Sequence, residues 1–236
     1  MMRRRRRAAR LGFEFKRTAG FHPPGNLIIQ GRQLNLSCPN EVSAITHFLS
    51  AFLDDEYRLG VHKWNVTTVL DIGANFGFFS LAARNTFANA KIHAYEPKKA
   101  FAKHLRHHAK QASFDIHYES VGLLDENKDS SLVLDESTAR KNPNPSMSPA
   151  QVSFRHVVER LGARVDFAKI DCGGFEWDFL DDQDPWQRIH FLALKYNIKS
   201  VQKSHYDIHL ALRKLGFQVL RLKPFDYYGF AFAMRL

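Results

Sequence analysis

The strongest chemical signal in the sequence is VLDIGANFGFF, residues 69–79, where an aspartate ends an apolar run and two glycines follow. Glycine costs conformational entropy, so a pair of glycines between a strand and a helix indicates unusual backbone angles or a close neighbour. We expect a cofactor to approach bare backbone at Gly73 and Gly77. We also expect Asn75 to tolerate left-handed backbone geometry, as asparagine does more readily than most residues.

The spacing of these residues argues against two common phosphate-binding loops. A P-loop needs a lysine after its last glycine, and none follows Gly77; a dinucleotide loop needs glycine where Asn75 and Phe78 stand. The stretch instead reads D-x-G-x-N-x-G, and an acidic residue, Glu96, ends the next apolar run. A carboxylate there can accept hydrogen bonds from both hydroxyls of a ribose.

S-adenosylmethionine fits this pattern because it carries a ribose, an adenine and an amino-acid end but no phosphate. We therefore predict that Asp71, Gly73, Asn75, Gly77 and Glu96 bind this cofactor, with the Asp71 carboxylate near its ammonium group. The alternative is an ordinary tight turn followed by an exposed glutamate.

Strands and helices alternate from residue 66 onward, which indicates a parallel sheet with helices on both faces. Ligands of such sheets bind at the carboxyl ends of the strands. His108 falls on a basic amphipathic segment, where we expect it to face solvent. The expected strands are 66–72, 90–97, 114–124, 165–170, 189–195 and a closing hairpin of 217–223 and 228–236; the expected helices are 76–87, 98–112, 153–161, 175–181 and 202–215.

The chain has 236 residues, which suits one α/β domain with N-terminal additions. We predict a basic, disordered tail at 1–20, a hairpin and helix extension at 21–62, and the main domain at 63–236. The proline-rich segment 135–151 is expected to be a long loop, either a lid or disordered.

The net charge is +10, and residues 1–17 supply +7 of it (eight Lys or Arg and one Glu). Such a tail suits nucleic acid or an anionic membrane surface. The two cysteines form no CxxC motif, so we expect a reduced compartment, with the cytoplasm first and an organelle or the nucleus as alternatives. We expect no metal site and, without an apolar run of ~18 residues, no membrane span.

The stretches VLDIGANFGFFSLAAR, IHAYEPKKAFAKHLRHHA and VDFAKIDCGGFEWDFL resemble the FkbM family of S-adenosylmethionine-dependent methyltransferases. The resemblance covers roughly residues 55–220. It implies a Rossmann-like class I methyltransferase fold, with a seven-stranded, mostly parallel sheet and an antiparallel C-terminal hairpin. It also implies methyl transfer to an oxygen of a small molecule or a sugar.

Three positions depart from the family pattern near the acceptor end. Gly173 stands where the family has glutamate, and Lys195 and Asn197 replace the glutamate and histidine of a later Glu-x-His. We predict Asp171 as the base and Lys195 as a group that orients the acceptor or neutralises a developing alkoxide.

Other readings remain open for this end of the site. Asp171 and Lys195 could be the middle pair of a ribose-methylating Lys-Asp-Lys-Glu tetrad in an RNA methyltransferase, although no glutamate follows Glu176 to close it. The three departures also suit a non-catalytic protein that binds the cofactor or a partner. The sequence does not identify the methyl acceptor or the oligomeric state.

Overall fold

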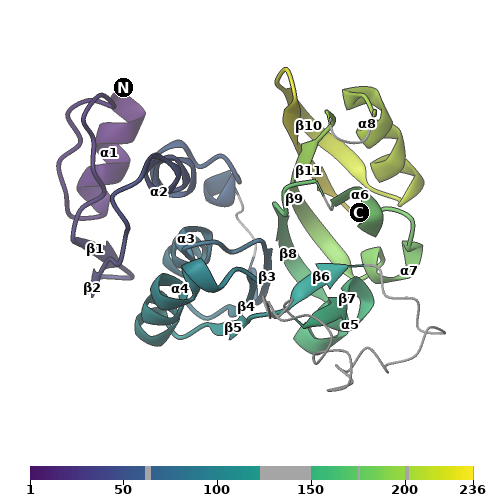
Figure 1. Ribbon diagram of the computed structural model, residues 1–236, viewed down its shortest axis with the longest axis horizontal. Coiled ribbons are helices and arrows are strands. Elements are labelled where there is room, and N and C mark those ends of the chain that lie inside the picture. Colours follow the sequence, from purple (N-terminus) through teal and green to yellow (C-terminus); the bar gives the residue numbers. More distant parts are fainter. Residues whose placement is uncertain (62–64, 123–149, 175, 200–201, 236) are drawn as a thin grey trace, which may run out of the picture.

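The computed structural model describes residues 1–61, 65–122, 150–174, 176–199 and 202–235. At its centre lies a seven-stranded sheet of order β10-β11-β9-β8-β3-β4-β5 (Figure 1). Its strands pair in parallel except at β11, which is antiparallel to both neighbours. This confirms the predicted sheet and hairpin. The strands are β3 (Thr68–Ile72), β4 (Lys91–Tyr95), β5 (Asp115–His117), β8 (Val165–Ile170), β9 (Ile189–Asn197), β10 (Gln218–Pro224) and β11 (Tyr228–Met234).

Helices cover both faces of the sheet and create two separate apolar cores. Successive residues of a strand point to opposite faces, so Val69 joins one core and Leu70 the other. The first core packs against α3 (Phe78–Thr86) and α4 (Lys99–Ala112). The second packs against α5 (Phe154–Leu161), α6 (Glu176–Phe179), α7 (Gln183–Trp186) and α8 (His205–Lys214).

The N-terminal elements extend the first core. Strands β1 (Asn26–Ile29) and β2 (Arg32–Asn35) form the expected antiparallel hairpin. Helix α2 (Val42–Phe48) continues into the π-helix η1 (Leu49–Asp54), and the short 3₁₀-helix η2 (Leu59–Val61) follows. The helix expected over this region is therefore present but irregular, and its last turns lie against α3.

The first residues are not the disordered tail that the charge suggested. Helix α1 (Met2–Arg10) is folded against η1, with Ala8 fully buried. Arg4 and Arg7 pair with Asp54 and Asp55 at 2.6 and 2.9 Å. Arg4 and Arg7 thus dock on the protein, whereas Arg3, Arg5 and Arg6 are exposed. This docked helix corrects the expectation of disorder.

Two further expectations change. The strand expected at 114–124 is divided into β5 and β6 (Ser120–Gly122), and β6 pairs in parallel with β7 (Gln151–Ser153). His108 is 1% exposed rather than solvent-facing, because the backbone N–H of Ser37 donates to its Nε2 at 2.9 Å.

Most of the expected loop 135–151 lies outside the described residues, and the domain boundaries at 20 and 62 stay predictions. Among the helices that the structure describes, none is long and apolar enough to cross a membrane.

Candidate functional site

The glycine stretch forms the turn between β3 and α3, at the carboxyl edge of the sheet. Gly73, Asn75 and Gly77 all have left-handed backbones, with φ of 77°, 52° and 83°. The left-handed Asn75 confirms the sequence-based expectation. The backbone N–H groups of Gly73 and Ala74 both donate to the carbonyl of Tyr95, which ties this turn to the end of β4.

The two glycines are crowded by the protein itself, not only by the space a ligand would occupy. A Cβ at Gly73 would clash with the carbonyl oxygen of Asp171, at the end of the neighbouring strand β8. A Cβ at Gly77 would lie 2.8 Å from Leu105 of α4. Close packing of the end of β8 and of α4 is therefore one reason for glycine at both positions, and the approach of a cofactor to them stays a prediction.

Asp71 lies deeper than expected for a residue that contacts a ligand. It is 0% exposed; Lys169 Nζ donates to its Oδ1 at 2.9 Å, and Ser80 donates to its Oδ2 at 2.7 Å. Lys169 also donates to the carbonyls of Ile72 and Gly73 at 3.1 and 2.6 Å. Asp71 thus holds the ammonium that fixes the turn, and its direct contact with a cofactor stays a prediction.

Glu96 follows β4 and faces the same turn. Its Oε2 accepts the backbone N–H of Asn75, and its Oε1 accepts that of Lys98, both at 2.9 Å. Each carboxylate oxygen has a further lone pair for a ligand hydroxyl. The residue is only 5% exposed. The two backbone hydrogen bonds thus fix the carboxylate at the edge of the sheet where a ribose is expected.

One polar atom in the turn has no partner among the described residues. Asn75 Oδ1 is buried without a hydrogen bond, while its Nδ2 lies 3.3 Å from His47 Nε2. A buried acceptor without a donor is costly, so a ligand with N–H or O–H groups would satisfy it. S-adenosylmethionine has such donors, and the turn therefore fits this cofactor.

A second polar group lies at the end of β8, beside the glycine turn. Asp171 Oδ2 accepts from Tyr57 Oη at 3.0 Å and from Lys195 Nζ at 3.2 Å. Burial acts to raise the pKa of Asp171, but the charges of Lys169 and Lys195 outweigh it and hold that pKa below its ordinary value. Burial and the charge of Asp171 raise the pKa of Tyr57 well above 10, so Tyr57 remains a donor.

The structure shows what surrounds Gly173 and Asn197, two of the three departures from the family pattern. Gly173 has a left-handed backbone with φ of 72°, and a Cβ there would meet nothing within 4 Å. Glu176 accepts the backbone N–H groups of Gly174 and Asn197, and burial raises its pKa. Glu176 therefore ties α6 to β9, whereas Gly173 leaves open space beside Asp171.

The structure thus brings Asn75 and Glu96 together at one turn, and Asp171 and Lys195 at the next. Sequence reasoning assigned no role to Tyr57, His47 or Lys169. Only Lys169 had a usable signal, since a lysine inside a fully buried strand needs a partner. Within the described residues, no group of three or more His, Cys, Asp or Glu side chains could hold a metal ion.

The sequence of this chain matches a known protein family. The model of the methyltransferase FkbM domain matches residues 71–219, more than half of the chain. The chain belongs to the FkbM methyltransferase family. No curated protein matches it.

Several solved structures resemble this FkbM protein in fold. A precorrin-6y C5,15-methyltransferase from Geobacter metallireducens has 14% identity and a TM-score of 0.46, over 85% of this chain and 94% of that one. A SAM-dependent methyltransferase from Aquifex aeolicus has 16% identity and a TM-score of 0.45, over 80% and 92%. TrmK from M. capricolum, in complex with S-adenosylhomocysteine, has 13% identity and a TM-score of 0.44, over 75% and 66%.

Membership of the FkbM family makes this protein an S-adenosylmethionine-dependent methyltransferase. Its seven-stranded sheet with an antiparallel C-terminal hairpin is that of a class I methyltransferase.

Proposed function

We propose that this FkbM protein methylates a hydroxyl group of a small molecule or a sugar, and that Asp171 accepts the hydroxyl proton. The observation that carries this proposal is the position of Asp171. Its carboxylate lies at the end of β8 with Tyr57 and Lys195 as hydrogen-bond donors, next to the turn of Gly73. The side chain is 11% exposed, so it is close to the surface yet largely shielded from water.

The cofactor would be held by the adjacent edge of the sheet. Glu96 would accept from the ribose hydroxyls, and Asn75 Oδ1 would accept from a ligand N–H or O–H group. Gly73 and Gly77 would allow close backbone approach, while Asp71 would act through Lys169 on the shape of the turn. When bound, S-adenosylmethionine supplies a methyl group carried by a positively charged sulfonium.

The lowered pKa of Asp171 is compatible with a role as proton acceptor. The hydroxyl proton becomes strongly acidic as its oxygen gains a methyl group. Even a weakly basic carboxylate can therefore take this proton if it is well placed. Asp171 is ionised at neutral pH, because the neighbouring lysine charges lower its pKa from the ordinary value of an aspartate. Lys195, 32% exposed, would orient the acceptor oxygen and balance negative charge that develops on it.

The test is an assay with methyl-labelled S-adenosylmethionine and a panel of hydroxylated sugars and phenols. We expect Asp171→Asn to lower turnover by about 10²-fold or more, with affinity for S-adenosylhomocysteine nearly unchanged. Tyr57→Phe is the matched control, because it removes only one hydrogen bond to Asp171 and should cost about tenfold or less. Full turnover by Asp171→Asn would show that Asp171 is not the proton acceptor.

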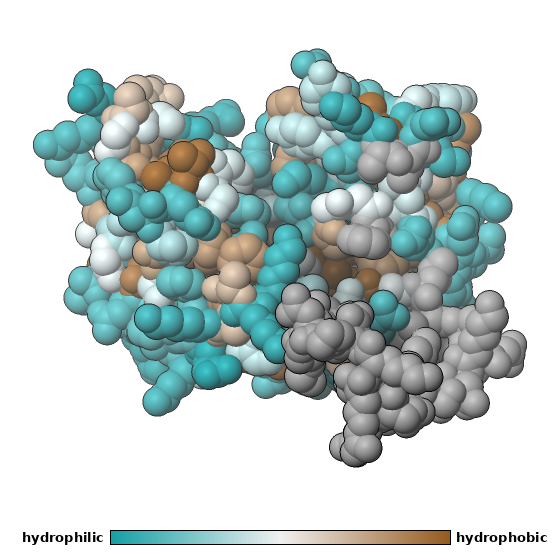
Figure 2. All heavy atoms as spheres, viewed as in Figure 1, coloured by the Kyte–Doolittle hydropathy of each residue, from teal (hydrophilic) through white to brown (hydrophobic). Residues whose placement is uncertain are grey.

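A second candidate acceptor is a single-stranded nucleic acid, and lysines over aromatic rings favour it. Lys199 Nζ lies 4.6 Å from the ring centroid of Tyr227, and Lys203 Nζ lies 5.9 Å from that of Trp177. Base stacking with adjacent cations is the usual mode of single-strand recognition. The surface at α1 and the surface at the β10–β11 hairpin lie on either side of a hollow, and both carry hydrophilic side chains beside apolar ones (Figure 2).

This candidate can be tested without disturbing the fold. Arg3, Arg6 and Arg10 are exposed, so their replacement by glutamine should leave the docked face of α1 intact. If the acceptor is RNA, affinity for a labelled oligonucleotide should fall steeply with salt, and the triple variant should weaken it further. Affinity that is equal for the parent and the triple variant would remove α1 from the RNA-binding surface. Methylation confined to small hydroxylated molecules would exclude the nucleic-acid candidate.

A further inference from the structure

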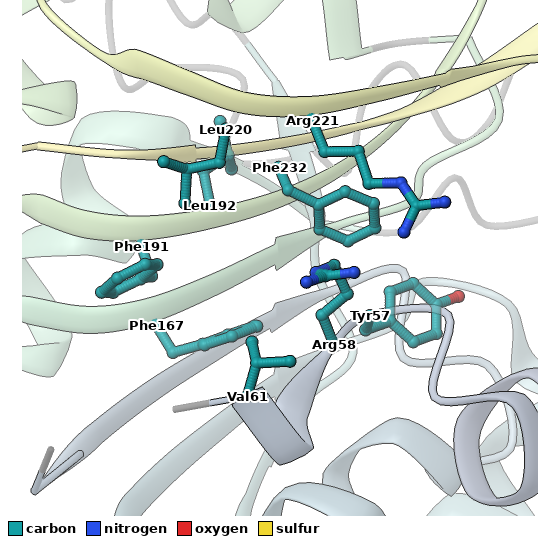
Figure 3. Close-up of a pocket in the computed structure, with 9 residues that line it drawn as sticks. All are labelled: Tyr57, Arg58, Val61, Phe167, Phe191, Leu192, Leu220, Arg221 and Phe232. Atoms are coloured by element: carbon teal, nitrogen blue, oxygen red, sulfur yellow. The ribbon is translucent and has the colours of Figure 1, made fainter. Parts of the chain in front are cut away.

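A cavity of about 310 Å³ lies on the face of the sheet that carries α3, away from the glycine turn. It is formed where η2 passes over β8, β9, β10 and β11 (Figure 3). Its volume is at the lower end of the range of ligand pockets, ~300–1000 Å³. Phe191 lines it near the start of β9, whereas Lys195 of the proposed catalytic group lies near the end of that strand. The lining residues are Tyr57, Arg58, Val61, Phe167, Phe191, Leu192, Leu220, Arg221 and Phe232.

Two irregularities of the backbone bring arginines to this cavity. Arg58 has a left-handed backbone with φ of 57°, held by a hydrogen bond from its N–H to the carbonyl of Asp55 at 2.9 Å. The pairing of β10 with β11 shifts register between Val219 and Arg221, so strict alternation of side chains is lost and both Leu220 and Arg221 line the cavity. Such departures are costly and tend to mark functional positions.

The two guanidinium groups lie at the same end of the cavity. Figure 3 shows both beside the ring of Phe232, with Phe167 and Phe191 at the other end. Arg58 Cζ is 5.6 Å from the centroid of the Phe232 ring. The cavity therefore has a cationic end and an aromatic end, which is the arrangement that an amphipathic anion would need.

The arginines at this cavity have no acidic partner among the described residues, unlike several arginines elsewhere. Arg4, Arg7 and Arg160 each pair with a carboxylate. Over the described part of the chain, neither Arg58 nor Arg221 forms a salt bridge. Two guanidinium groups near one another repel, and a carboxylate placed between them would relieve that repulsion through charge-assisted hydrogen bonds.

We propose that this cavity is a binding site for a small organic carboxylate with an apolar tail. Its carboxylate contacts Arg58 and Arg221, and its tail lies against the aromatic wall formed by Phe167, Phe191 and Phe232. The site is separate from the methyl-transfer site but touches it through one residue. The ring of Tyr57 lines the cavity, while its hydroxyl donates to Asp171. The proposal does not depend on which acceptor is methylated.

The experiment is a calorimetric titration of the full chain with octanoate. Octan-1-ol and octylamine are the controls, because they carry the same eight-carbon tail without the carboxylate. We expect octanoate to bind at least about tenfold more tightly than either control. We expect Arg221→Gln to weaken octanoate binding by at least about tenfold, because a charge-assisted hydrogen bond is lost. Arg213→Gln is the matched control, since Arg213 is exposed on α8 and away from the cavity, and it should bind like the parent.

Arg58→Gln serves as a second variant with the same expected loss, and thermal melting of each variant shows that the fold is kept. The proposal is overturned if octanoate does not bind, if octan-1-ol binds equally well, or if both arginine variants bind octanoate like the parent. Because no methyl transfer is measured, this result is independent of the test of Asp171.

Discussion

Two neighbouring strands of the sheet, β3 and β8, end in glycine turns that look alike in sequence and differ in structure. Gly73 after β3 and Gly173 after β8 have nearly the same left-handed φ, 77° and 72°. A side chain at Gly73 would clash with the carbonyl of Asp171, whereas one at Gly173 would meet open space. The first turn is fixed by the packing of the protein, and the second leaves room beside the proposed catalytic carboxylate.

The same difference separates the proposed cofactor side of the site, after β3, from the proposed acceptor side, after β8. The turn after β3 is built from backbone hydrogen bonds, the Lys169 ammonium and the supported Glu96 carboxylate, so it has little freedom. The turn after β8 presents a hydrogen-bonded network of Asp171, Tyr57 and Lys195, in which only Lys195 is substantially exposed. We infer that the cofactor side is rigid, and that the acceptor side is where this chain departs from its family.

The largest effect is expected from Gly73→Ala, which tests the rigid turn. It combines a clash with Asp171 and a strained left-handed alanine, so we expect the free energy of unfolding to fall by about 4 kcal/mol. Urea denaturation measures it. Gly31→Ala is the matched control, because Gly31 has φ of 72° and open space around it, and it should cost only about 1 kcal/mol. Equal losses at the two positions would mean that backbone strain alone, and not the approach of β8, requires Gly73.

The next effect concerns the charged acceptor side. We expect Lys195→Met to lower turnover by roughly ten- to a hundredfold, because it removes the cation that we propose to face the acceptor oxygen. Affinity for S-adenosylhomocysteine should stay within about twofold, since Lys195 contacts Asp171 and not the turn after β3. A loss of cofactor affinity as large as the loss of turnover would contradict the division between the two sides.

The smallest effect is expected from Gly173→Ala, which probes the open turn. Its stability should fall by only about 1 kcal/mol, the cost of a left-handed alanine. A drop as large as that of Gly73→Ala would show that the open space beside Asp171 does not exist in solution.

The sequence predicted much of the fold because its signals were local or carried by the family resemblance. The alternation of strands and helices, the closing hairpin and the left-handed Asn75 are all confirmed. The reason for Gly73 was not predictable, because the atom that crowds it belongs to Asp171, which follows β8 far along the chain. The same is true of Tyr57, which reaches Asp171 from the segment before β3 and carries no local signal.

The N-terminal segment shows that the charge of a segment alone does not predict whether it is folded. Seven positive charges in excess suggested a disordered tail, but the acidic partners Asp54 and Asp55 lie at the end of η1, beyond the hairpin. His108 was expected on a solvated face for a similar reason, since its partner Ser37 comes from the N-terminal extension. Residues whose local sequence pattern predicted exposure are thus buried by partners that are distant in sequence.

We expect the edge formed by the turn after β3 and by Glu96 to bind S-adenosylmethionine. Calorimetric titration of the parent and of Glu96→Ala with S-adenosylhomocysteine tests it most directly, with Glu14→Ala as control, because the Glu14 side chain is 75% exposed. We expect micromolar binding by the parent and the control, and an affinity at least about tenfold lower for Glu96→Ala. Equal affinity of all three proteins would contradict the assignment of Glu96, and absence of binding by the parent would contradict the claim itself.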